Sequence, residues 1–164
     1  MKGIRTAETV SLKCYHPVYL EQLKTYQLSI EDQEFTGMPL ESIGICSKDK
    51  NRYPIVIDDS GLAVGYFVLH GGEDIKGFTD NDYALLLRTY SVDSRYRGMG
   101  MAKQSLRLLP DFVRKHFLYV NEIILAVNHR NTAAQQVYKK GGFADTGKRI
   151  LGRTGEQLIF FMKL

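Results

Sequence analysis

The stretch best suited to binding an anionic ligand is a short glycine turn with a basic residue at each end, Arg97-Gly98-Met99-Gly100-Met101-Ala102-Lys103. Glycine has no Cβ, so a ligand can approach its backbone closely. If a helix begins at the end of such a turn, its first N–H groups lack internal partners and can point at a phosphate. Without that helix, the same residues would form a tight, solvated loop.

The segments flanking the turn favour phosphate binding. Residues 83–92 are apolar and β-rich, which predicts a strand, and leucines at helical spacing after residue 103 predict a helix that ends near Tyr119. Pro110 lies inside this helix, and an interior proline removes one hydrogen bond and usually kinks the helix. The order of strand, glycine turn and helix therefore predicts a phosphate-binding loop.

The chain before the turn predicts four strands and two helices from its apolar periodicity and turn residues. An acidic segment, residues 31–34, lies between the two helices, and a glycine-containing acidic loop, residues 70–82, precedes the fourth strand. The strands are expected at residues 10–14, 53–57, 62–69 and 83–92, and the helices at residues 17–28 and from Pro39 onward.

The chain after the central helix predicts a strand, a helix and a closing hairpin. Residues 122–127 form a nearly continuous apolar run, as in a strand covered on both faces. Asn131 opens a helix that Gly141 and Gly142 stop. With hairpin strands at residues 143–151 and 157–164, the sequence predicts an α/β fold: a mixed sheet of about seven strands with helices on both faces.

Composition excludes several classes of protein. At 164 residues and 44% hydrophobic content, we expect a single domain over residues 1–164. The excess of 22 basic over 18 acidic residues is too mild for a nucleic-acid binder. No apolar run is long enough to span a membrane, and residues 1–5 lack the apolar core of a signal peptide.

The cysteines and histidines point to a cytoplasmic protein without a metal. Cys14 and Cys46 are the only cysteines, and we expect both thiols to be reduced in a cytoplasmic location. The four histidines show no paired spacing with cysteine, so no zinc site is expected.

The layout and two local motifs resemble the GCN5-related N-acetyltransferase superfamily over nearly the whole chain. The superfamily's phosphate-loop pattern (Gln or Arg, two residues, Gly, one residue, Gly or Ala) is met by residues 97–102. Its second motif is met by Asn131-Thr132-Ala133-Ala134-Gln135-Gln136-Val137-Tyr138-Lys139-Lys140-Gly141-Gly142-Phe143. Each pattern alone is moderately specific, but both in the expected order make coincidence improbable.

The resemblance implies acetyl-CoA as cosubstrate, with its pyrophosphate held by backbone N–H groups of residues 98–103. It also implies that the strand edge around Tyr90 and Val92 pairs with the pantetheine amides, and that the fourth and fifth strands splay apart. Tyr138 would lie near the CoA sulfur and protonate the leaving thiolate, and Asn131 would lie near the pantetheine. The alternatives are a core tyrosine at position 138 and a helix N-cap at position 131.

The implied reaction is direct attack of a neutral primary amine on the thioester, with a strand-four N–H stabilising the oxyanion. Some superfamily members carry a glutamate base nine residues before the loop arginine, where this chain has Arg88. The general base is therefore unassigned. Arg88 either binds an acidic group of the acceptor or forms a structural ion pair, and the ion pair is the more common role.

The acceptor is expected to be a primary amine, either a small molecule such as a polyamine or amino-sugar, or a peptide amine. This expectation rests on the two acidic segments, represented by Glu34 and Glu73, in regions that face the acceptor in the superfamily. If they converge near the thioester they would attract a cationic amine. Otherwise they are ordinary solvated carboxylates.

Two other functions fit parts of the sequence. A non-catalytic acyl-CoA-binding domain is favoured by the missing strand-four glutamate and opposed by Tyr138. A dinucleotide-binding oxidoreductase is weaker, since the glycine turn comes late and lacks a third glycine. The protein is expected to be a monomer or a homodimer.

Overall fold

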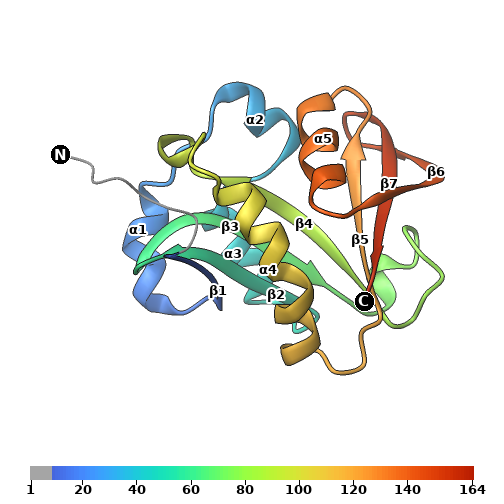
Figure 1. Ribbon diagram of the computed structural model, residues 1–164, viewed down its shortest axis with the longest axis horizontal. Helices are drawn as coiled ribbons and strands as arrows, with labels where there is room; N and C mark the ends of the chain where they lie inside the picture. Colours follow the sequence, from blue (N-terminus) through green and yellow to red (C-terminus); the bar gives the residue numbers. More distant parts are fainter. Residues whose placement is uncertain (1–8) are drawn as a thin grey trace.

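A computed structural model describes residues 9–164, so the segment assessed for a signal peptide lies outside the described residues. Seven strands form one sheet in the order β1-β2-β3-β4-β5-β7-β6 (Figure 1). Neighbouring strands are antiparallel except for β4 and β5, which are parallel. This mixed sheet, with helices on both faces, confirms the predicted fold class.

The strands are β1 (Val10–Cys14), β2 (Arg52–Asp59), β3 (Leu62–His70), β4 (Ala84–Val92), β5 (Glu122–Asn128), β6 (Ala144–Gly152) and β7 (Gly155–Lys163). The α-helices are α1 (Leu20–Lys24), α2 (Ile30–Phe35), α3 (Pro39–Cys46), α4 (Met101–His116) and α5 (Thr132–Lys140). Short 3-10 turns occur at Pro17–Tyr19, Glu73–Ile75 and Ser94–Tyr96.

Alternation along the strands divides the core between the two faces of the sheet. On β2, Ile55, Val56 and Ile57 are all 0% exposed. Ile55 and Ile57 pack with the apolar side of α4, whereas Val56 packs with buried residues of the α1 and α3 region. Figure 1 shows α4 crossing in front of the strands and α3 behind them. The sheet is thus covered on both sides.

The helical expectation for residues 17–28 is wrong in its second half. A 3-10 turn leads into α1, which ends at Lys24. Tyr26 and Leu28 are buried beyond the helix end, so their helix-like spacing reflects burial in a non-helical segment. The acidic segment, for which no helix was predicted, lies in α2, where the Ser29 hydroxyl accepts a hydrogen bond from the Asp32 N–H at 3.1 Å.

The central helix α4 runs through Pro110 and ends at His116 rather than near Tyr119. A proline removes only one backbone hydrogen bond, and the buried residues Leu106, Leu109 and Phe112 keep this helix on the sheet. Beyond its end, Phe117 is buried although it is no longer helical. Because Phe117 is apolar, the helical spacing of apolar residues in the sequence continued past the true end of the helix.

The fourth and fifth strands separate halfway along their length, as predicted. β5 pairs with β4 only between residues 84–87 and 122–125, and then continues beside β7. Beyond the branch, Thr89 has a positive φ of 54° where the β3–β4 register shifts, which marks a β-bulge. Within residues 9–164, the edge of β4 from residue 88 onward therefore has no neighbouring strand on the β5 side.

Candidate active site

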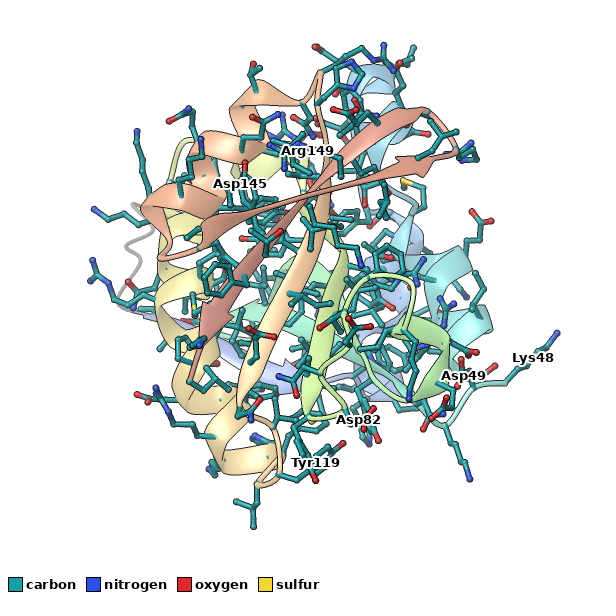
Figure 2. All side chains as sticks on the ribbon, turned by 90° about the vertical axis from the view of Figure 1, so that its right-hand side faces the viewer. Lys48, Asp49, Asp82, Tyr119, Asp145 and Arg149 are labelled. Atoms are coloured by element: carbon teal, nitrogen blue, oxygen red, sulfur yellow. The ribbon has the colours of Figure 1, made fainter. Side chains whose placement is uncertain are left out.

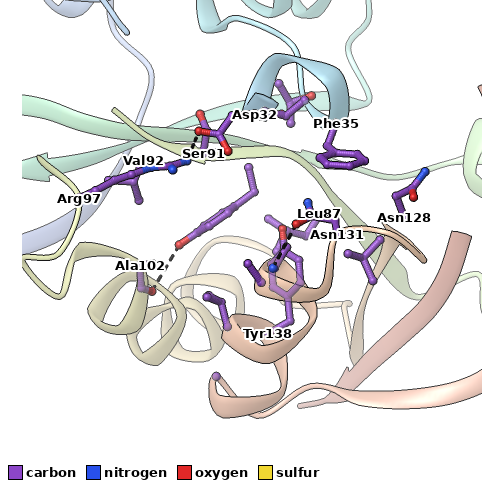
Figure 3. A pocket seen from close by; sticks show the side chains of 18 of the residues that line it. Asp32, Phe35, Leu87, Ser91, Val92, Arg97, Ala102, Asn128, Asn131 and Tyr138 are labelled. Atoms are coloured by element: carbon purple, nitrogen blue, oxygen red, sulfur yellow. Dashed lines mark hydrogen bonds and ion pairs between the residues drawn. The ribbon is translucent and has the colours of Figure 1, made fainter. Parts of the chain in front are cut away.

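A cavity of about 850 Å³ lies where β4 and β5 diverge (Figure 3). One part, here called the glycine-turn wall, is formed by residues 97–103 apart from Met99. A second part, here called the composite wall, is formed by side chains from α2, β4, β5 and the β6–β7 hairpin: Asp32, Phe35, Thr36, Arg88, Asn128, Thr154 and Gln157. Between them lie the β4 edge, including Tyr90 and Val92, and residues of α5.

The glycine-turn wall has the backbone geometry of an anion site. Gly98 has φ 74°, and Gly100 caps the N-terminus of α4 with φ 80°. A Cβ added at Gly98 would meet no atom within 4 Å, because that position faces open space. Lys103 lines the cavity just inside the helix, and Met99 packs against the apolar core instead. The wall therefore offers exposed backbone and positive charge.

Arg97 joins the two walls through an ion pair with Asp32 of α2 (Figure 3). Its neighbour Arg95 binds the buried Asp93 carboxylate at 2.8 Å and supports the turn that precedes the glycines. Asp32 is the one carboxylate among the described residues that line the cavity. Because Arg97 holds it, the described residues leave no unpaired negative charge in the cavity.

Two tyrosines lie side by side at the branch of the strands. The Tyr90 hydroxyl is 2.6 Å from the Ser105 hydroxyl of α4. Tyr138 of α5 packs edge-on against the rings of Tyr90 and Phe143, with centroid distances of 5.8 and 6.0 Å. Among the described residues its hydroxyl has no hydrogen-bond partner, and it lines the cavity. Tyr138 is thus both a packed residue and a cavity residue.

Burial raises the pKa of Tyr138 above its ordinary value of 10, and the nearby Tyr90 adds to this effect. A phenol whose pKa is raised keeps its proton at neutral pH. The hydroxyl of Tyr138 can therefore donate a proton to a strong acceptor in the cavity.

Asn131 and Asn128 organise the end of β5. The Asn131 side chain accepts a hydrogen bond from the Ala134 N–H at 3.2 Å, so it caps α5 while it lines the cavity. Asn128 is buried, and its amide donates to the Thr154 hydroxyl at 2.9 Å. This contact connects β5 to the β6–β7 hairpin. Sequence reasoning missed Asn128, Thr154 and Phe35 because no local motif marks them.

The two acidic segments do not converge at the cavity. Glu34 pairs with Arg130 at 2.9 Å and does not line the cavity. Glu73 pairs with Lys76 at 3.5 Å in the loop before β4, and it does not line the cavity either. Figure 2 shows Asp82 of that loop at the same end of the molecule as Tyr119, beyond the C-terminus of α4. The loop enters β4 at the end remote from the branch.

Arg88 lines the cavity, but its partner is not a carboxylate. Its Nη1 lies 3.2 Å from Nδ1 of His70 on β3, and no ion pair of Arg88 occurs within residues 9–164. The expected structural ion pair is therefore replaced by a contact with an imidazole. Burial, together with the nearby Arg52, lowers the pKa of Arg88.

Sequence comparisons with known proteins indicate a single family. Residues 13–143 match the acetyltransferase (GNAT) family. The N-acetyltransferase YbbJ of Bacillus subtilis (strain 168) is 41% identical over 153 residues, which cover 93% of this chain and 96% of that protein.

Solved structures share the fold at low identity. The aminoglycoside acetyltransferase AAC(6')-Ib, in complex with paromomycin and acetyl-CoA, has a TM-score of 0.77 at 15% identity, covering 94% of this chain and 93% of that one. The Vibrio cholerae spermidine N-acetyltransferase, in complex with CoA and spermine, has a TM-score of 0.64 at 14% identity, covering 95% of this chain and 96% of that one.

Proposed function

This chain belongs to the acetyltransferase (GNAT) family, and on that premise we propose that it transfers the acetyl group of acetyl-CoA to a primary amine. The observation that carries the proposal is a single cavity that joins the glycine turn, the free edge of β4 and Tyr138. The shared fold with structures that hold acetyl-CoA or CoA beside an amine compound supports the choice of cosubstrate.

Acetyl-CoA binding is assigned to the glycine-turn wall and the β4 edge. Backbone N–H groups of residues 98–103 hold the pyrophosphate, and Arg97 and Lys103 add charge. The pantetheine amides pair with the free edge of β4 around Tyr90 and Val92, in the manner of an added strand. Asn131 caps α5 beside the same arm. On this assignment the thioester lies at the branch of β4 and β5.

The chemistry follows from this placement. The amine nitrogen attacks the thioester carbonyl carbon, a C–N bond forms, and the C–S bond breaks as the tetrahedral intermediate collapses. A backbone N–H of β4 stabilises the oxyanion. The Tyr138 hydroxyl gives its proton to the departing thiolate and recovers one from solvent. The products are an N-acetylated amine and free CoA.

The proton of the attacking amine leaves through water. No histidine or glutamate lines the cavity within the described part of the chain, and Asp32 is engaged by Arg97. A primary amine has an ordinary pKa near 10 and is mostly protonated at neutral pH. We therefore expect kcat/KM to rise with pH as the neutral amine becomes more abundant.

The test is an acetylation assay with a panel of primary amines: polyamines, aminoglycosides, amino acids and short peptides. We expect release of free CoA thiol that depends on the amine, with the acetylated product identified by mass spectrometry. Tight acetyl-CoA binding without transfer to any amine would instead identify a non-catalytic acyl-CoA-binding domain.

A further inference from the structure

A cluster of charged and polar residues extends from the cavity across β4 and β3. Arg88 lies opposite Val68, and His70 lies opposite Leu86, so these side chains share one face of the sheet. Val68 packs with the α1 and α3 region, which identifies this face as the one away from α4. Arg88 therefore reaches the cavity from the face of the sheet opposite to α4.

The contact with Arg88 determines which nitrogen of His70 carries the proton. A guanidinium can only donate hydrogen bonds, so Nδ1 of His70, at 3.2 Å from Arg88, must accept. The proton of the neutral ring is then on Nε2, which lies 3.7 Å from Asp49 and 3.9 Å from Asp74. Burial lowers the pKa of His70, and Arg52 and Arg88 lower it further. His70 is therefore a neutral acceptor.

This tautomer argues against a metal at the same cluster. Single ligand atoms of Asp49, His70 and Asp74 lie within 4.8 Å of one another. A metal would need the lone pair of Nε2, but the hydrogen bond from Arg88 assigns the proton to that nitrogen. The hydrogen bond with Arg88 instead orients the ring, with its Nδ1 toward the guanidinium.

Among the described residues, no carboxylate forms an ion pair with Arg88 to compensate its positive charge. Asp49 forms its ion pair with Arg52 at 3.2 Å and lies on the far side of His70, 3.7 Å from Nε2. Asp32, in the cavity, is held by Arg97. Arg88 is half-buried, and a charge removed from water without an opposite charge is costly. A bound anionic group would compensate it.

We propose that Arg88 binds a carboxylate on the acceptor, so that the substrate is an amino acid or a peptide with a free carboxylate as well as the reactive amine. This inference rests on the proposed acetyl transfer. A planar guanidinium with two parallel donors matches one carboxylate in both charge and geometry. A phosphate, with its second charge, would need further donors. His70 is a positioning residue because it holds the guanidinium without neutralising it.

The test compares short peptides with the same peptides carrying a C-terminal amide, and free amino acids with their amides. Binding to the CoA-saturated protein is measured by calorimetry, and kcat/KM is measured where turnover occurs. We expect the carboxylate form to bind at least about 10-fold more tightly, as for hydrogen bonds to charged groups. Arg88→Gln abolishes this preference, and for the carboxylate form it raises KM rather than lowering kcat.

Two further variants make the test specific. Arg88→Lys keeps the positive charge but loses the planar guanidinium with its two parallel donors. It should therefore retain only part of the preference for the carboxylate form. Arg52→Gln is the matched control, since Arg52 lies on the same face and does not line the cavity. It should keep the full preference.

The possible results separate this proposal from the proposed function. Carboxylate preference that depends on Arg88, in a protein without transferase activity, supports the subsite and contradicts the acetyl transfer. Equal binding of acid and amide by the native protein, or equal loss of both in Arg88→Gln, overturns the subsite. A stronger Arg88-dependent preference for an amine that carries a phosphate also overturns the assignment to a carboxylate.

Discussion

The glycine-turn wall of the cavity comes from one uninterrupted stretch, residues 97–103, whereas the composite wall draws single side chains from residues as far apart as Asp32 and Gln157. The first wall offers backbone groups and open space at glycines with positive φ. The second offers side chains that are held by partners outside this wall, such as Arg97 for Asp32 and His70 for Arg88.

From this difference we infer different tasks for the two walls. Backbone geometry suits a ligand part that is always the same, such as a pyrophosphate. Side chains that come from separate elements can be exchanged without changing the backbone of the turn, and they therefore suit the variable part, the acceptor. Disturbing the first wall should abolish CoA binding, while disturbing the second should change the choice of amine.

The largest effect is expected for Gly98→Val. A side chain here would enter the space that faces the ligand and would displace at least two hydrogen bonds to a charged group, which lowers CoA affinity on the order of 1,000-fold. Gly61→Val is the matched control, because Gly61 has φ 92° and equally open surroundings in the β2–β3 turn. CoA affinity of both variants is measured by calorimetry. Equal loss of affinity in Gly98→Val and Gly61→Val would contradict the assignment of CoA binding to the glycine turn.

The next effect concerns Tyr138, which lies between the two walls. Tyr138→Phe keeps the ring contacts with Tyr90 and Phe143 and removes only the proton donor, so kcat should fall about 100-fold. Acetyl-CoA affinity should hardly change. Tyr90→Phe is the control, since that hydroxyl is engaged by Ser105. Turnover is measured by the release of CoA thiol. If Tyr138→Phe has the same kcat as the native protein, Tyr138 only packs against its neighbours and is not the proton donor.

The free energy of unfolding should depend on pH through His70, the hydrogen-bond partner of Arg88 in the composite wall. Because the folded-state pKa of His70 is lowered by burial and by Arg52 and Arg88, the unfolded chain binds a proton more readily than the folded protein. The free energy of unfolding is therefore highest above the ordinary pKa of 6.5 and falls as the pH drops through that value toward the lowered folded pKa. Asp49 and Asp74 oppose this shift without reversing it.

Urea unfolding on either side of the ordinary histidine pKa measures the effect. His70→Asn should show a weaker pH dependence than the native protein, because asparagine keeps a hydrogen-bond acceptor but does not titrate. CoA affinity over the same range should be equal in the two proteins. An unchanged pH dependence in His70→Asn would show that other groups titrate in this window.

The smallest effect is expected for Asp32→Asn, at the ion pair that connects the walls. Releasing Arg97 from Asp32 makes its guanidinium available to the pyrophosphate, and exposed ion pairs contribute about 0.2–1 kcal/mol. CoA affinity should rise by no more than about 5-fold, with less gain at high salt. Weaker CoA binding in Asp32→Asn would mean that Asp32 supports the turn rather than competing for Arg97.

The sequence by itself determined the parts of this protein that depend on neighbouring residues. Glycines that require positive φ, a capping Asn131 and alternating apolar strands can be identified from a few adjacent positions. The glycine turn, the helix that carries Tyr138 and the mixed sheet could therefore be predicted. The short helix α2 was missed because six residues provide little periodicity, although Ser29 marks its start.

Only the tertiary structure decided which charges meet. Arg88 faces His70 because of the register between β3 and β4, and Glu34 meets Arg130 across a separation of 96 positions. Glu73 is directed away from the cavity because its loop enters β4 at the end remote from the branch. Such pairings depend on strand register and on packing between distant segments, which local residue patterns do not specify.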